Sequence, residues 1–82
     1  KVLNYYKHSK IVFVRLEAET LKVGDSVYLI GNTTGVINQK VSNIVKDNIE
    51  IEIANKGDEV TFVCEDTVRV NDKVYKIIDV RS

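Results

Sequence analysis

Apolar and polar residues alternate along most of this chain with a period of two, and no helical spacing competes with it. β-branched residues dominate the apolar positions and proline is absent, which is typical of β-strands with one face in a core. Segment 11–16 is apolar on both faces until Arg15, so we expect it to be central. The alternation predicts strands at residues 2–6, 11–16, 26–30, 36–45, 49–53, 60–64 and 74–78.

Two of these segments allow more detailed expectations. Segment 36–45 is long for a strand and loses its alternation at Ile44, so we expect a β-bulge near Ser42 and Asn43. Segment 49–53 alternates isoleucine strictly with glutamate. This pattern predicts that its isoleucines face the core and its glutamates face water.

A short motif recurs three times, each time just before an apolar run. Residues 24–27, 57–60 and 71–74 each consist of Gly or Asn, then Asp, a variable residue and Val. Glycine adopts positive φ without steric cost, and asparagine tolerates it better than most residues. The aspartate can accept hydrogen bonds from nearby backbone amides. Each copy therefore predicts a tight turn that starts a strand with its valine facing inward.

Short strands that recur about every ten residues favour a sandwich or a small barrel. We predict an all-β fold, a small closed antiparallel barrel of six or seven strands, because closure leaves no strand edge exposed. The length of 82 residues indicates a single domain over residues 1–82.

The charge balance limits the possible partners. Twelve basic residues match twelve acidic ones, and a net charge of zero argues against strong non-specific binding of nucleic acid. Residues 1–41 nevertheless hold six basic and three acidic residues, a difference of +3. This excess indicates either a solvated hairpin or a weak phosphate-contacting edge.

Several features bear on the location and completeness of the chain. No apolar run approaches the ~20 residues that cross a bilayer, so no membrane contact is expected. A single cysteine excludes an intramolecular disulfide and fits a reducing compartment, so we predict a cytoplasmic protein. Methionine is absent, and the chain is therefore expected to be a piece of a longer protein or a trimmed form.

Residues that could carry chemistry are few. His8 and Cys64 are single in their types and lack metal-ligand spacing, so we expect no metal and no cofactor. Cys64 shares an apolar face with Phe62, which indicates a buried structural thiol. His8 precedes Ser9, but neighbours on a turn point apart and nothing orients the imidazole. We predict that this chain alone is not an enzyme.

The binding candidates are tyrosines and two polar connections. The four tyrosines either stack on nucleic-acid bases or lie at the core edge with the hydroxyl in water. Tyr5 and Tyr6 are adjacent, so at least one should face outward. We predict a binding surface on the first hairpin and on the Gly31–Gly35 loop, with these residues: Lys7, His8, Lys10, Asn32, Thr33 and Thr34.

Five motifs, in order, resemble a known barrel. Residues 21–27, Gln39-Lys40-Val41 and residues 54–60 resemble domain 2 of the translation elongation factor Tu superfamily. The Gly-x-Thr-Thr loop at 31–34 and the ending at 68–76 are similar to those of small translation elongation factor-like proteins. The barrel is also similar to the C-terminal accessory domain of collagenase-like bacterial peptidases, whose catalytic part lies upstream.

The resemblance implies a non-catalytic β-barrel binding module that contacts RNA, tRNA or a translation-linked protein. The alternative is a C-terminal accessory domain of a larger enzyme of the collagenase-like peptidase family, which recognises substrate or docks on an upstream catalytic domain. The chain departs from the family at residues 7–10, where the family usually has a glycine. No tRNA-contacting residue of the translation factors can be matched here, and the GTP-binding domain is missing from this chain.

Overall fold

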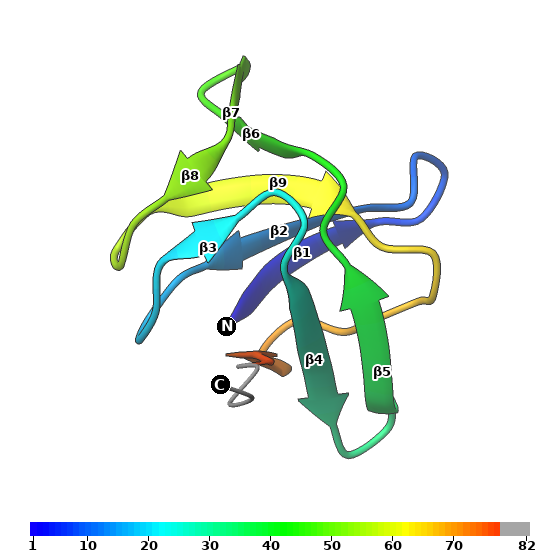
Figure 1. The fold of residues 1–82 in the computed structure, drawn as a ribbon. Helices are drawn as coiled ribbons and strands as arrows, with labels where there is room; N and C mark the ends of the chain where they lie inside the picture. Colours follow the sequence, from blue (N-terminus) through cyan, green and yellow to red (C-terminus); the bar gives the residue numbers. More distant parts are fainter. Residues whose placement is uncertain (78–82) are drawn as a thin grey trace.

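The computed structural model describes residues 1–77, and all regular elements in this range are β-strands (Figure 1). The all-β prediction is confirmed, although the strands are shorter and more numerous than expected. Their bounds are β1 Val2–Tyr6, β2 Ile11–Arg15, β3 Leu21–Lys22, β4 Ser26–Gly31, β5 Gly35–Lys40, β6 Ile44–Lys46, β7 Ile49–Ile51, β8 Ile53–Ala54, β9 Glu59–Val63 and β10 Lys73–Lys76. The end of the strand predicted at 74–78, residue 78, lies outside the described residues.

The strands form three antiparallel sheets. The largest has the order β1-β2-β9-β6-β7, the second β10-β4-β5, and the third pairs β3 with β8. β2 is an interior strand, as predicted for segment 11–16. The β4–β5 hairpin runs at a steep angle to β2 and β9 (Figure 1). Within residues 1–77 no sheet closes on itself, so the predicted closed barrel is not confirmed.

The single strand expected at 36–45 is wrong. β5 ends at Lys40 and β6 begins at Ile44, and residues 41–43 carry the chain from the second sheet to the first. The lost alternation marks this change of sheet and not a bulge. Val41 is fully buried there, and its backbone hydrogen bonds with Gly24 and Asp25 extend the β4–β5 pairing just beyond Lys40.

The expectation that the isoleucines of 49–53 face the core holds for Ile51, which packs against the core, but is wrong for Ile49 and Ile53. Ile49 and Ile53 are 65% and 52% exposed, because the strand breaks at Glu52 into β7 and β8. β7 is the outermost strand of its sheet, and the core position after the break belongs to Ala54, which is fully buried. Alternation determined which residues share a face but not which face is covered.

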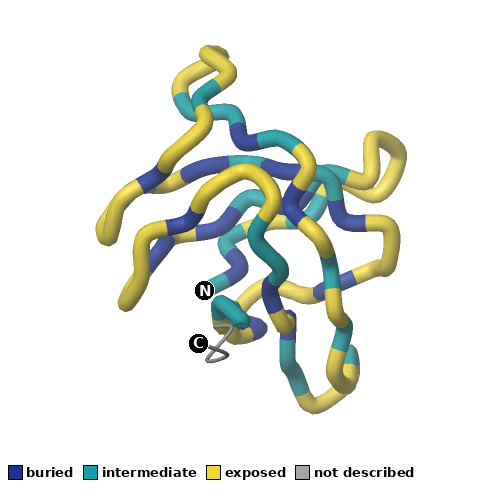
Figure 2. The backbone as a smooth tube through the Cα atoms, in the orientation of Figure 1, coloured by how far each residue is buried: buried dark blue, intermediate teal, exposed yellow. Residues whose placement is uncertain are grey.

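Fourteen apolar side chains of residues 1–77 form the core between the sheets. β2 and β9 supply alternate residues to it, and both strands show this alternation in Figure 2. The core residues are Val2, Val12, Val14, Leu16, Leu21, Val27, Leu29, Val41, Ile44, Ala54, Val60, Phe62, Cys64 and Val68.

The recurring motif forms three equivalent turns, which we call corner turns: Lys22–Asp25, Asn55–Asp58 and Arg69–Asp72. In each, the aspartate N–H donates to the carbonyl three residues earlier, at 3.0, 3.0 and 3.1 Å. The aspartate carboxylate in turn accepts the N–H of that earlier residue, at 2.9, 2.8 and 2.9 Å. The third position has φ of +100°, +92° and +76°, which fits a type II turn. The turn prediction is confirmed in all three copies.

Each corner turn also binds one buried residue from a distant segment. In the first turn, the Gly24 N–H donates to the Val41 carbonyl at 2.7 Å, and the Val41 N–H donates to the Asp25 carbonyl at 2.8 Å. The second turn exchanges the same two hydrogen bonds with Leu16, and the third exchanges them with Val2. In the first two turns these bonds extend the β4–β5 and β2–β9 pairings by one residue, and in the third they connect β1 to the turn before β10.

Replacement of Gly24 by valine should lower the free energy of unfolding by more than about 1 kcal/mol, because a β-branched residue resists φ near +100°. Urea denaturation measures this change. Asn71→Gly is the matched control at the same position of the third turn, and it should change stability little, since glycine accepts positive φ. An unchanged free energy of unfolding in Gly24→Val would show that this position does not require positive φ.

The hydrogen bonds of the Asp58 carboxylate should make the stability of the domain depend on pH. Its pKa is lowered by the hydrogen bond from the Asn55 N–H and by the bond from the Lys46 ammonium at 3.0 Å. A folded-state pKa below the ordinary 3.8 contributes stability above that pH, and this stability is lost as the pH falls through the folded value. Asp58→Asn keeps an acceptor but cannot ionise.

Wild type should therefore be more stable than Asp58→Asn at neutral pH, and the difference should narrow below the ordinary value of 3.8. Denaturation curves at several pH values test this. Asp66→Asn is the control, because no hydrogen bond or ion pair of the Asp66 carboxylate occurs within residues 1–77. A constant difference between wild type and Asp58→Asn would contradict the prediction.

Candidate functional site

The described residues offer little catalytic chemistry. Cys64 is fully buried, and burial raises the pKa of its thiol, which disfavours the nucleophilic thiolate. His8 lies exposed on the β1–β2 turn. Within residues 1–77, no group of three or more His, Cys, Asp or Glu side chains is arranged to hold a metal ion. None of these residues forms a helix that could span a membrane.

The two predicted binding segments do not meet directly. The turn with Lys7, His8 and Lys10 joins β1 to β2, whereas the Gly31–Gly35 loop ends the β4–β5 hairpin at a separate edge of the domain (Figure 1). The Lys10 ammonium lies 3.6 Å from the Glu65 carboxylate, which partly neutralises its charge. The predicted residues therefore do not form one contiguous patch by themselves.

The third corner turn connects the two segments. One open hollow of about 610 Å³ places Asn32 and Thr33 beside Arg69 and Val70. A second hollow, of about 540 Å³, places Lys7 beside the same Arg69 and Val70. We call the combined area the basic surface, and it consists of Lys7, Asn32, Thr33, Arg69, Val70, Lys73 and Tyr75.

The basic surface carries three cations and no exposed carboxylate. Within residues 1–77, none of Lys7, Arg69 and Lys73 forms an ion pair. Val70 and Tyr75 are 54% and 50% exposed beside them, so apolar area accompanies the positive charge. This combination suits a partner that is anionic and partly apolar.

The carboxylate next to the basic surface, that of Asp72, has a structural role. It is 7% exposed and accepts hydrogen bonds from the Arg69 N–H and from the Thr34 hydroxyl. Gly31 packs directly on it, because a Cβ at this position would lie 1.9 Å from Asp72 Oδ1. The Gly-x-Thr-Thr loop is thus held by its first and last residues. Only Asn32 and Thr33 remain available for binding, and Thr34 is not.

The four tyrosines differ in their surroundings. The Tyr5 hydroxyl donates to the Cys64 carbonyl at 2.9 Å, so Tyr5 lies at the core edge. Tyr6 faces outward and is 47% exposed, as expected for one of two adjacent residues. Tyr28 and Tyr75 are direct cross-strand neighbours on the outer face of the β10-β4-β5 sheet, and both are exposed.

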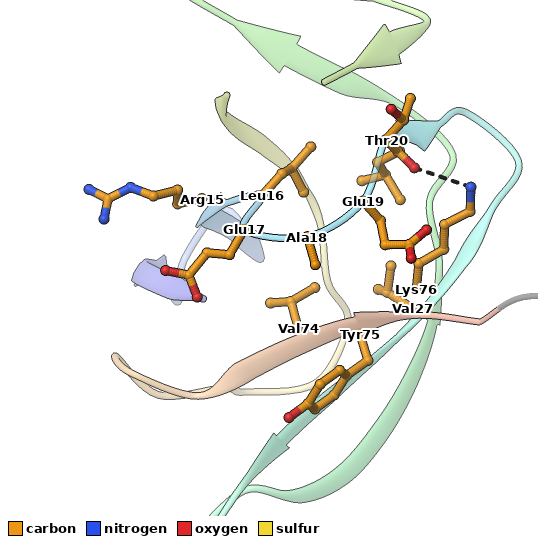
Figure 3. A pocket seen from close by; sticks show the side chains of 11 residues that line it. Arg15, Leu16, Glu17, Ala18, Glu19, Thr20, Val27, Val74, Tyr75 and Lys76 are labelled. Atoms are coloured by element: carbon orange, nitrogen blue, oxygen red, sulfur yellow. Dashed lines mark hydrogen bonds between the residues drawn. The ribbon is translucent and has the colours of Figure 1, made fainter. Parts of the chain in front are cut away.

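A smaller and more enclosed pocket lies under the link between β2 and β3 (Figure 3). Its volume is about 150 Å³, and its apolar walls come from Leu16, Ala18, Leu21, Val27 and Val74. Glu17 and Glu19 flank Ala18 on the link. Sequence reasoning missed this pocket, since residues 17–20 have the composition of an ordinary surface link and nothing in them predicts what packs below.

The fold is similar to that of the C-terminal domain of a candidate U32 peptidase from Geobacillus thermoleovorans. That crystal structure matches with a TM-score of 0.87 and 20% identity, over 94% of this chain and 88% of that chain. The selenomethionine variant of the same domain matches with a TM-score of 0.84 and 21% identity, over 92% and 93%. No protein-family model and no curated protein matches this chain. At these identities the likeness shows the fold.

Replacement of Gly31 by alanine should destabilise the domain by about 1–3 kcal/mol, because the added methyl overlaps the Asp72 carboxylate. Thermal unfolding measures the loss. In an Asp72→Ala background the overlap is removed, so the same Gly31→Ala change should cost less there. Equal losses in both backgrounds would show that Gly31 and Asp72 are not coupled.

Proposed function

We propose that this domain is a non-catalytic accessory module of a larger protein, in which it docks on a catalytic domain or helps it to hold substrate. The observation that carries the proposal is the match to the C-terminal domain of a candidate U32 peptidase. The match extends over nearly the whole of both chains. The sequence resemblance to the accessory domain of collagenase-like peptidases leads to the same proposal.

The chemistry of the described residues supports a binding role. The thiol of Cys64 is buried, and His8 is an exposed turn residue without a hydrogen bond from its imidazole within residues 1–77. Exposed surface area is available instead, on the basic surface around Arg69. These features suit a domain that binds a partner or substrate for a larger protein and does not itself catalyse a reaction.

The comparisons give the translation-factor hypothesis no support. Both matching structures are of a peptidase domain, and neither is a translation protein. RNA and tRNA therefore enter the experiment below only as control ligands.

The basic surface is the part of the domain that we assign to docking. Its cations, Lys7, Arg69 and Lys73, are complementary to an acidic face of a catalytic domain. Val70 lies among them and would supply the apolar centre of such an interface.

The test begins with the gene that encodes this chain, which should encode a catalytic domain upstream. Removal of residues 1–82 from that protein should leave turnover of a small substrate nearly unchanged and should lower kcat/KM for a macromolecular substrate. Steady-state kinetics on both substrates measures the split. A gene that encodes these residues alone, or equal losses on both substrates, would contradict the proposal.

The corner turns provide a matched pair of variants. Arg69→Glu with Val70→Ser changes the basic surface, and Lys22→Glu with Val23→Ser changes the equivalent exposed positions of the first turn. Only the first pair should weaken the contact between this domain and the isolated catalytic domain, as measured by calorimetry. Equal effects of both pairs, or tighter binding of RNA than of the catalytic domain, would overturn the assignment.

A further inference from the structure

The outer edge of β10 has unpaired backbone groups. The Ile77 N–H donates to the Ser26 carbonyl at 2.8 Å, and these two residues are opposite each other in the β10–β4 register. Hydrogen-bonded pairs alternate along an antiparallel ladder, so Tyr75 also bonds toward β4. The N–H and C=O groups of Val74 and Lys76 therefore point away from β4, and no strand of residues 1–77 pairs with them.

A groove runs along this free edge. The 150 Å³ pocket under the link and an open hollow of about 500 Å³ share four lining residues: Glu17, Ala18, Val74 and Tyr75. They are therefore continuous. β10 forms one wall of the groove, and the link Glu17–Thr20, which belongs to no strand, forms the other (Figure 3). The groove has the shape that one extended chain would need.

The inner end of the groove accepts an apolar side chain. Leu16, Leu21 and Val27 are nearly fully buried beneath it, and the side chain of Ala18 points toward Val74 across it (Figure 3). An apolar cavity of about 150 Å³ is of the size that holds a benzene molecule, so it accommodates one aliphatic side chain.

The unpaired charge at this end is negative. Arg15 pairs with Glu59 at 2.9 Å, and Lys76 lies 3.4 Å from the Asp25 carboxylate and also donates to the Thr20 carbonyl. Glu17 and Glu19 form no ion pair within residues 1–77. Lys1 and Lys73 line the other, open end of the groove. An occupant of the pocket end therefore meets two free carboxylates.

We propose that this groove binds an extended segment of another protein, with alternating aliphatic and basic residues, as an added strand on the free edge of β10. The backbone of the segment pairs with Val74 and Lys76, one aliphatic side chain fills the pocket, and basic side chains reach Glu17 and Glu19. This is recognition by β-strand addition. Lys73 and Tyr75 line both this groove and the basic surface, but Glu17, Ala18 and Glu19 lie outside the basic surface. Substitutions at these three residues therefore test the groove separately from the proposed function.

The short edge explains why the pocket matters. β10 has four residues and a lysine at each end, which are features that discourage non-specific pairing of exposed edges. Backbone pairing over so few residues is weak, and binding then depends on the anchoring side chain. The groove is therefore selective for a segment with an aliphatic residue in the right register.

Titration of the isotope-labelled domain with a capped heptapeptide of alternating lysine and valine, monitored by NMR, tests this proposal. Shifts should occur in β10 and in residues 16–20. An analogue with N-methyl groups along its pairing edge should lose binding, and Glu17→Lys with Glu19→Lys should weaken binding about tenfold. Glu50→Lys with Glu52→Lys, at exposed positions with the same spacing, is the control and should leave binding unchanged.

Ala18→Phe provides a second variant that fills the pocket from an exposed position and should abolish binding without a loss of stability. Equal binding of the N-methylated analogue would overturn the proposal. Chemical-shift changes confined to β5, β7 or the part of the basic surface outside β10 would also overturn it, as would stronger binding of a glutamate–valine peptide or of single-stranded RNA. Self-association of the domain through β10 that excludes the peptide would assign the edge to a second copy.

Discussion

The aspartate of the corner turn is the interaction on which the rest of this domain depends. Its backbone closes the turn, its carboxylate accepts the first amide of the turn, and its carbonyl accepts the amide of a buried residue from a distant segment. Three such turns bind Val2, Leu16 and Val41 into the core. The strands of residues 1–77 are short, and the first two turns add backbone hydrogen bonds beyond the ends of the β4–β5 and β2–β9 ladders, while the third connects the first sheet to the second through Val2.

The three turns are equivalent in backbone but not in surroundings, and the candidate sites follow from this difference. The aspartates of the first two turns pair with lysines, Lys76 and Lys46. The third, Asp72, instead accepts a hydroxyl from Thr34 and packs on Gly31. The third turn is thereby attached to the β4–β5 hairpin, and its exposed side chains lie between two open hollows.

The domain combines a well-connected core with a gap in its hydrogen bonding. β10 pairs with β4 on one edge, and residues 17–20 opposite its other edge form no strand. The gap explains why no sheet closes within residues 1–77, and the groove lies there. The free edge of β10 and the basic surface recognise different partners. Backbone pairing at the edge selects an extended segment, whereas the charge of the basic surface selects an acidic partner.

The strand class, the three turns and the core faces of β2 and β9 could be predicted from the sequence, because these depend on local periodicity and on backbone conformation. Lys7, Asn32 and Thr33 could be predicted in the same way as surface residues. The exposure of Ile49 and Ile53, the change of sheet at residues 41–43 and the position of the third turn between the two predicted binding segments became visible in the folded structure. Coverage of a strand and proximity of distant loops depend on long-range packing, which local alternation does not encode.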